Sequence, residues 1–281
     1  MIREWGQAAG WMDALGLGPR EHVAVVGGGG KTSLCFALAH EMLAAGKRVV
    51  TTTTTKVWQR EAHVAPGVVF SPCGVPDLHR LNQDLGTKKH IFIGRRPLDS
   101  GKVEGLAPEV ADLLFRNLDV DYVIAEADGA AGRPVKAPAG QEPVIAASTT
   151  VVIAVMGLEA LGRRLDPQRV FRLKEVMKVT GLREGDMLTP GGLAVLFWSP
   201  DGLFKGTPRS AKKMALLNKS DRLGPDQDVK DLVYRILESP HSQIERIIVG
   251  SLARGACRVW MHDGQDAGMP RRHCESDQNP G

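Results

Sequence analysis

Short runs of apolar residues alternate with longer segments of helical periodicity along most of the 281-residue chain. This alternation predicts βαβ units arranged around a mostly parallel sheet with flanking helices, which is the α/β class. The apolar runs lack polar alternation, so we expect the strands to be buried on both faces of the sheet. The predicted strands cover residues 22–26, 48–52, 90–93, 121–125, 150–155, 213–217 and, as the last strand, 243–249.

Helical periodicity connects these strands at 32–45, 108–118 and 226–238. The pattern changes over 157–207, where a basic amphipathic piece at 169–178 is followed by a helix that Thr189 and Pro190 would open. We interpret 157–207 as a helical insertion that covers one end of the sheet. Its basic residues form either a docking face for an acidic partner or anionic cofactor, or a solvated helix face.

The pattern also suggests the domain organisation. Residues 1–262 are expected to form a single P-loop α/β domain that carries the insertion. Residues 263–281 are polar, contain glycine and proline and lack periodicity, so we expect a disordered tail.

Composition excludes several function classes. Hydrophobic residues make up 43% of the chain, but no apolar run approaches the roughly 18 residues that a membrane span needs, and no signal-peptide core precedes Arg20. We therefore expect a cytoplasmic protein without a membrane partner. The net charge of +4 is mild and no dense basic stripe is present, which argues against nucleic acid as a partner. The four cysteines are scattered and indicate neither a disulfide framework nor a zinc ribbon.

A run of glycines is the sharpest chemical feature, because it stands between a predicted strand and a predicted helix. The segment reads Gly27, Gly28, Gly29, Gly30, Lys31, Thr32 and Ser33. Glycines let consecutive backbone N–H groups curl around a phosphate, and the helix N-terminus adds further donors. Lys31 would reach phosphate oxygens and the Thr32 hydroxyl would coordinate Mg²⁺. A P-loop has its first glycine where this chain has Val25, so the loop is either compact or re-registered.

Two carboxylates end the strand predicted over 121–125. Glu126 and Asp128 lie two residues apart, so they point to the same side of an extended strand. Beside a phosphate-binding loop, such residues hold Mg²⁺ or its waters, or orient the attacking group. We name Asp128 together with Thr32 as the metal ligands, with Glu126 as the alternative carboxylate. The structural alternative is a pair of acidic residues that caps a strand end.

The sequence Asn218-Lys219-Ser220-Asp221 follows a further predicted strand. Asn-Lys-x-Asp is the pattern with which GTPases read guanine: the Asp accepts hydrogen bonds from the base and the Lys stem covers the ring. Gly250–Ala253 follows the last predicted strand, where GTPases place a short loop that supports the base. A helix-capping turn would use the same residue types. The nucleotide is therefore expected to be GTP or ATP.

Two polar segments complete the candidate site. Thr54 belongs to a tract of five threonines at the carboxyl edge of the sheet, where doubly wound folds bind ligands; the alternative is that threonine only extends the strand. Arg133 and Lys136 lie in a loop rich in Gly and Pro that leaves Asp128. They would form a substrate clamp or an internal arginine finger, or belong to a solvated loop.

Taken together, the strings GGGGKT, TTTTTK, EADGAAGRPVKAP, QEPV and LNKSD resemble the YqeC-type selenium cofactor biosynthesis proteins. The resemblance runs from about Val23 to Asp221, and Glu126–Pro138 is its most distinctive part. It implies a P-loop NTPase-like accessory protein for the maturation of selenium-dependent molybdenum hydroxylases, and it leaves the reaction open. By motif match it implies nucleotide contacts at Gly30, Lys31 and Thr32, and signature positions at Glu126, Asp128 and Lys136.

The leading hypothesis is a Mg²⁺-dependent protein that hydrolyses a nucleoside triphosphate or transfers its phosphoryl group. Catalysis would consist of positioning and charge neutralisation by Lys31, Glu126, Asp128, Arg133 and Lys136. The partners would be the nucleotide and a molybdopterin-type cofactor or a molybdenum hydroxylase apoprotein. The alternative is a carrier that binds a nucleotide or a molybdopterin-type cofactor in the same loop without hydrolysis.

Overall fold

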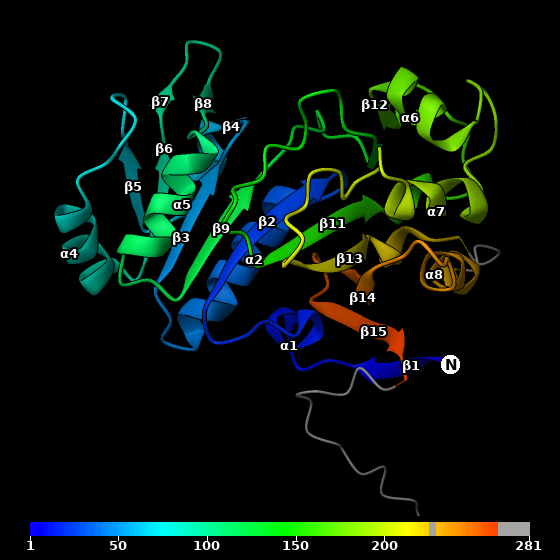
Figure 1. Cartoon of the computed structure of the whole chain (residues 1–281), viewed down its shortest axis with the longest axis horizontal. Helices are drawn as coiled ribbons and strands as arrows, with labels where there is room; N and C mark the ends of the chain where they lie inside the picture. Colours follow the sequence, from blue (N-terminus) through cyan, green and yellow to red (C-terminus); the bar gives the residue numbers. More distant parts are fainter. Residues whose placement is uncertain (225–228, 264–281) are drawn as a thin grey trace, which may run out of the picture.

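A ten-stranded sheet organises the protein in the computed structural model, which describes residues 1–224 and 229–263 (Figure 1). Eight adjacent strands, from β14 to β5, run parallel, while β15 is antiparallel to β14 and to β1. The predicted α/β class with a mostly parallel sheet is confirmed. The strand order is β1 (Ile2–Gln7), β15 (Ala256–His262), β14 (Ile244–Ser251), β13 (Lys212–Asn218), β11 (Val151–Gly157), β2 (Glu21–Gly27), β9 (Tyr122–Glu126), β3 (Val49–Thr53), β6 (His90–Gly94) and β5 (Gly67–Phe70).

Helices cover both faces of the sheet, which explains the uninterrupted apolar runs. In β2, Val23 and Val25 pack on the side of α1 and α2, whereas Ala24 and Val26 pack on the side of α7 and α8. Figure 1 shows α4 and α5 over one end of the sheet and α7 and α8 over the other. The helices are α1 (Trp11–Leu15), α2 (Lys31–Ala44), α4 (Leu78–Lys88), α5 (Pro108–Asn117), α7 (Pro190–Trp198) and α8 (Val229–Leu237).

The prediction that 243–249 is the last strand is wrong, because β15 follows it and pairs with β1 at the edge of the sheet. Neither strand carries a continuous apolar run: exposed Arg258 separates buried Cys257 from buried Val259. β1, the edge strand, has no fully buried residue, and β15 lies between β1 and β14 with a longest apolar run of only three residues, so continuous apolar runs reveal neither strand. The sequence pattern also missed α1, α4, β5, the short α3 (Gln59–Ala62) and a small sheet of β4 (Lys56–Trp58), β8 (Lys102–Glu104) and β7 (Arg96–Pro97).

The segment 157–207 contains more than helices. It begins with the 3₁₀ turn η1 (Leu158–Ala160), and its strand β12 (Val170–Phe171) pairs with β10 (Val135–Lys136) before α6 (Leu173–Thr180) and α7. The amphipathic piece predicted at 169–178 is therefore partly a strand, because backbone pairing to a distant segment overrides local periodicity. Thr189 caps α7 as predicted, since its side chain accepts a hydrogen bond from the Gly192 N–H.

Two predictions fall partly outside the described residues. The helix predicted over 226–238 is present as α8, and its predicted start at 226–228 lies outside them. Of the predicted tail, Asp263 is described and its N–H donates to the Met1 carbonyl, while 264–281 lie outside. Among the helices that the structure describes, none combines the length and apolarity of a membrane span.

Two buried histidines should make stability sensitive to mild acid. Burial lowers the pKa of His22, against the opposing charge of Asp112, and the pKa of His90, in both cases to about 4 from 6.5. Both rings are neutral in the folded protein. Their contribution to the free energy of unfolding is therefore complete above pH 6.5, and it is lost as the pH falls towards 4, by roughly 3 kcal/mol per histidine. Urea unfolding between pH 7 and 4 should show this slope. His90→Gln should flatten it, and the exposed control His79→Gln should not; equal slopes in both variants would contradict the assignment.

Candidate functional site

The glycine loop, Gly27–Gly30, connects β2 directly to α2 at the centre of the sheet. β2 continues through Gly27, so the connection is compact, as one of the two sequence alternatives required. Gly29 has a φ of +78° and packs closely on the end of β11, the neighbouring strand in the sheet. A Cβ added at Gly29 would lie 2.4 Å from the Gly157 nitrogen. Gly30 has a φ of +138°, and a Cβ there would lie 2.4 Å from Asn218 Nδ2. Side chains at these positions are excluded by both backbone conformation and space.

The N–H groups of the loop fall into two sets. Those of Gly27, Gly28 and Gly29 donate to the protein itself, to the Asp128 carboxylate (3.1 Å to each oxygen), the Val155 carbonyl (2.8 Å) and the Arg133 carbonyl (3.0 Å). Within the described residues, the N–H groups of Gly30, Lys31, Thr32 and Ser33 have no hydrogen-bond partner. The first turn of α2 therefore carries four free donors and the positive end of a helix dipole, which together favour an anion.

Lys31 lies folded against the loop between two carboxylates. Its Nζ donates to the Gly27 carbonyl (2.7 Å) and lies 3.4 Å from Asp128 Oδ1 and 3.6 Å from Glu126 Oε1. Burial alone would lower the pKa of Lys31, but the two carboxylates outweigh burial and raise it. Burial also raises the pKa of Glu126, against the opposing effect of the Lys31 ammonium. The site thus pairs a cation that stays charged with a carboxylate of increased basicity.

A buried chain of charges extends from Asp128 to the 157–207 segment. Lys136 is fully buried, and its Nζ lies 2.9 Å from Asp128 Oδ2, 2.9 Å from Glu142 Oε2 and 2.7 Å from the Gly129 carbonyl. Arg172, at the start of α6, binds the other side of Glu142 with a 2.6 Å contact. These contacts place Lys136 behind Asp128 rather than at the free donors of α2.

The residues of the Asn-Lys-x-Asp sequence gather on the other side of the glycine loop. Asn218 Nδ2 donates to the Gly29 carbonyl (2.8 Å), and its Oδ1 accepts from the Leu252 N–H (3.1 Å). A hydrogen bond from Ser251 lowers the pKa of exposed Asp221. Lys219 has a left-handed backbone (φ 66°), which is costly for a residue with a side chain. This strand end is thus joined both to the glycine loop and to the loop after β14.

The structure places the remaining predicted residues in less direct positions. The Thr54 N–H donates to the Glu126 carbonyl, but its hydroxyl turns away to the Val144 carbonyl (2.7 Å). The backbone of Arg133 touches the glycine loop, while its guanidinium donates to the Pro167 carbonyl (2.9 Å). Exposed Ser33 lies in the first turn of α2, so its N–H is the part that faces an anion.

Oxygen ligands suited to Mg²⁺ meet at the start of α2. Thr32 Oγ1 donates to Glu126 Oε2 (2.7 Å), so Glu126 is the carboxylate beside Thr32, whereas both Asp128 oxygens already accept from Gly27 and face lysines. The prediction that Thr32 and Asp128 hold the metal stays a prediction. Hydroxyl and carboxylate oxygens fit Mg²⁺, which usually takes one or two protein oxygens and completes its shell with phosphates and water. In the part of the chain that the structure describes, no cluster of three or more His, Cys, Asp or Glu could hold a metal.

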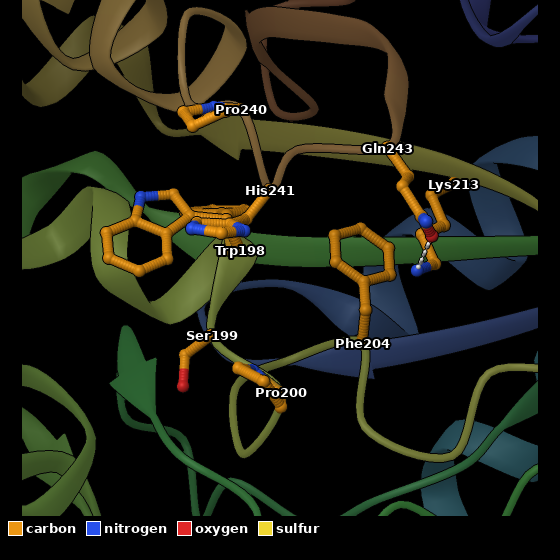
Figure 2. Close-up of a pocket in the computed structure, with 9 residues that line it drawn as sticks. Trp198, Ser199, Pro200, Phe204, Lys213, Pro240, His241 and Gln243 are labelled. Atoms are coloured by element: carbon orange, nitrogen blue, oxygen red, sulfur yellow. Dashed lines mark hydrogen bonds between the residues drawn. The ribbon is translucent and has the colours of Figure 1, made fainter.

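A separate hollow of about 560 Å³ lies at the opposite edge of the sheet (Figure 2). Lys213, at the start of β13, donates from Nζ to Gln243 Oε1 (2.7 Å) just before β14. The rings of Trp198 and His241 lie 6.1 Å apart on another wall, and Phe204 lines the space as well. Lys213 and Gln243 lie at the amino ends of β13 and β14. The hollow is therefore not part of the candidate site, which lies at the carboxyl ends of the strands.

Sequence reasoning missed Glu159 and Arg172 as parts of this site. Glu159 binds Lys219, and Arg172 binds Glu142. Glu159 could have been found, because it follows the predicted strand 150–155 and strand ends at this edge carry ligands. Arg172 gave no such signal, since it reaches the site only through the pairing of β12 with β10.

Comparison with known proteins covers most of the segments that form this site. The model of the YqeC protein family matches residues 23–174, which include the glycine loop, the Glu126–Asp128 strand end and the loop that carries Lys136. The chain belongs to the YqeC family. It is also 35% identical over 197 residues to a protein of Escherichia coli (strain K12) named "Uncharacterized protein YqeC", a match that covers 70% of this chain and 75% of that protein. In this YqeC protein, the Asn218 and Asp221 region lies beyond the family match.

Proposed function

We propose that this YqeC protein binds a Mg²⁺–nucleoside triphosphate, with a preference for GTP, and hydrolyses it or transfers its terminal phosphoryl group. We also propose that the fold is of the P-loop NTPase type. The observation that carries it is the bridge made by Asn218, whose side chain bonds both the Gly29 carbonyl and the Leu252 N–H. This bridge links the free donors at the start of α2 to the strand end that carries Asp221.

The residues can divide the work of phosphoryl transfer among them. The free N–H groups of Gly30 to Ser33 would bind phosphate oxygens, and Lys31 would exchange the Gly27 carbonyl for a phosphate oxygen. Thr32 and Glu126 would hold Mg²⁺, which when bound neutralises charge on the phosphates. Asp128 holds the loop through the Gly27 N–H and would keep Lys31 oriented. Glu126 acts in this scheme as the metal-holding carboxylate beside Thr32.

The role in the cell is part of the proposal. The resemblance of the Glu126–Pro138 segment to selenium cofactor biosynthesis proteins supports an accessory role in the maturation of selenium-dependent molybdenum hydroxylases. The acceptor would then be water, a selenium species or a molybdopterin-type cofactor. A cytoplasmic location would suit this role.

A nucleotide titration tests the proposal directly. Purified protein is titrated with GTP and with ATP, each with and without Mg²⁺, and phosphate release is followed. We expect Mg²⁺-dependent binding that is tighter for GTP, together with phosphate release. Binding of neither nucleotide would overturn the proposal. Tight binding without phosphate release, in the presence of candidate acceptors, would favour the carrier alternative.

Asp221→Asn should change which base is preferred. A carboxylate accepts hydrogen bonds from the N1–H and amino group of guanine, whereas an amide presents a donor that suits the oxygen of xanthine. We expect GTP to bind roughly 10- to 100-fold more weakly, because a hydrogen bond to a charged group is lost, and XTP to bind more tightly. The control is Asp201→Asn, an exposed carboxylate far from Asn218 in the chain. Unchanged base preference in Asp221→Asn would contradict the guanine assignment.

A further inference from the structure

Glu159 and Lys219 form an ion pair between the ends of β11 and β13, and Glu159 is assigned no task by the function proposed above. Glu159 lies in η1, directly after β11, and Lys219 lies directly after β13. Lys219 Nζ donates to Glu159 Oε1, and the two side chains are only 29% and 22% exposed. An ion pair this sheltered is screened much less by solvent than one on an open surface.

The surroundings of Glu159 are arranged to admit its carboxylate. A Cβ on Gly157 would lie 2.3 Å from Glu159 Oε2 and 2.8 Å from Pro134 Cβ, so only glycine at 157 leaves the space. Glu159 Oε2 is buried and accepts no hydrogen bond from the residues that the structure describes. A sheltered carboxylate oxygen without a hydrogen bond is unfavourable, so the charge of Glu159 is stabilised mainly through its contact with Lys219. Glu159 Oε1 is thus held by Lys219, while Oε2 occupies the space that Gly157 leaves.

The pair also lies where the two halves of the site meet. β11 stands in the sheet between β2, which carries the glycine loop, and β13, which carries Asn218. Gly157 touches Gly29 from one side, and the Asn218 side chain touches the Gly29 carbonyl from the other. Glu159 follows Gly157 by two residues and Lys219 follows Asn218 by one, so the pair joins the two strand ends that flank the glycine loop.

We propose that Glu159 is a positioning residue, which fixes the Lys219 side chain so that its methylene stem covers the nucleotide. This inference rests on the guanine-nucleotide site proposed above. A free lysine side chain samples many rotamers, and ordering it on binding would oppose affinity. The ion pair orders the ammonium before the nucleotide arrives, so the four-carbon stem already has its direction. Glu159 then acts on affinity for the nucleoside through Lys219, without touching the phosphates.

A double-mutant cycle tests this inference. Binding of Mg²⁺–GTP and of inorganic tripolyphosphate is measured by calorimetry for the wild type, Glu159→Ala, Lys219→Ala and the double variant. Glu159→Ala should weaken GTP about tenfold, the order expected for one immobilised side chain, and should leave tripolyphosphate unchanged. The double variant should bind GTP no more weakly than Lys219→Ala alone. Glu159→Gln keeps an oxygen that can accept from Lys219 and should recover part of the loss.

The matched control removes a carboxylate from an ion pair elsewhere. Asp231 pairs with Arg235 on the exposed face of α8, and Asp231→Ala should leave GTP affinity unchanged. Additive effects in the cycle, or an equal loss of tripolyphosphate binding in Glu159→Ala, would overturn the positioning role, since the residue would then support the loop itself. If the wild type and Glu159→Ala bind GTP equally well, the positioning role is wrong and the proposed function is unaffected. A wild type that binds no GTP defeats both this inference and the proposed function.

Discussion

Lys31→Met should reduce Mg²⁺-dependent phosphate release by a factor of about 100 to 1000, the range observed when one transition-state charge donor is removed. Lys31 is the cation that joins the glycine loop to both carboxylates, through the Gly27 carbonyl, Asp128 and Glu126. Phosphate release is measured at saturating Mg²⁺ and GTP. Lys47→Met is the control, because Lys47 lies beyond the opposite end of the same helix in a weak contact with Asp121 (4.0 Å).

The same substitution should also cost stability, and the cost should depend on pH. Without Lys31, buried Glu126 loses the ammonium 3.6 Å away, and Asp128 keeps Lys136 as its cationic partner. We expect a loss of several kcal/mol at pH 7 that shrinks as the pH falls and Glu126, whose pKa is raised by burial, becomes protonated. Circular dichroism therefore accompanies the activity assay, at a temperature where the variant is folded. A folded Lys31→Met variant that still releases phosphate at the wild-type rate would exclude Lys31 from catalysis.

Lys136→Met should have the largest effect on folding. The Lys136 side chain is 0% exposed and its ammonium contacts both Asp128 and Glu142, so its removal leaves a buried and a partly buried carboxylate with reduced charge compensation. Breaking a buried pair of this kind costs roughly 3–5 kcal/mol. Urea unfolding at pH 7 measures the loss. Lys178→Met is the matched control, because its pair with Asp201 is exposed and should contribute no more than about 1 kcal/mol.

The pH dependence of this variant provides a second measure. Hydrogen bonds from Lys136 and Arg172 outweigh burial and lower the pKa of Glu142. A lowered pKa means that the stabilisation is present above the ordinary pKa of the carboxyl group, 4.5, and is lost as the pH falls through the lowered value. Lys136→Met removes part of this effect, so its stability deficit should narrow in acid. A deficit of less than 1 kcal/mol at pH 7 would show that the buried network relaxes without Lys136.

Much of the central sheet could be predicted from local patterns. Strands such as β2 and β11 are buried on both faces, so their apolar runs are continuous and identify them. β1 and β15 could not be predicted in this way, because β1 has no fully buried residue and the apolar run of β15 is short; β1 is held by its pairing with β15, and β15 by its pairing with β1 and β14. The strand β12 was hidden in an amphipathic stretch, since its partner β10 lies some 35 residues earlier in the sequence.

The candidate site, like the sheet, could be predicted only in part. The sequence by itself determined the glycine loop, Glu126, Asp128 and the Asn218–Asp221 segment, because spacing relative to a strand end is a local property. Only the tertiary structure decided which of these side chains meet: Glu126 rather than Asp128 lies beside Thr32, Lys136 lies behind Asp128, and Glu159 holds Lys219. Such pairings depend on which strands are neighbours in the sheet and on how much space a glycine leaves between them. Those are relations between distant segments, and no local pattern records them.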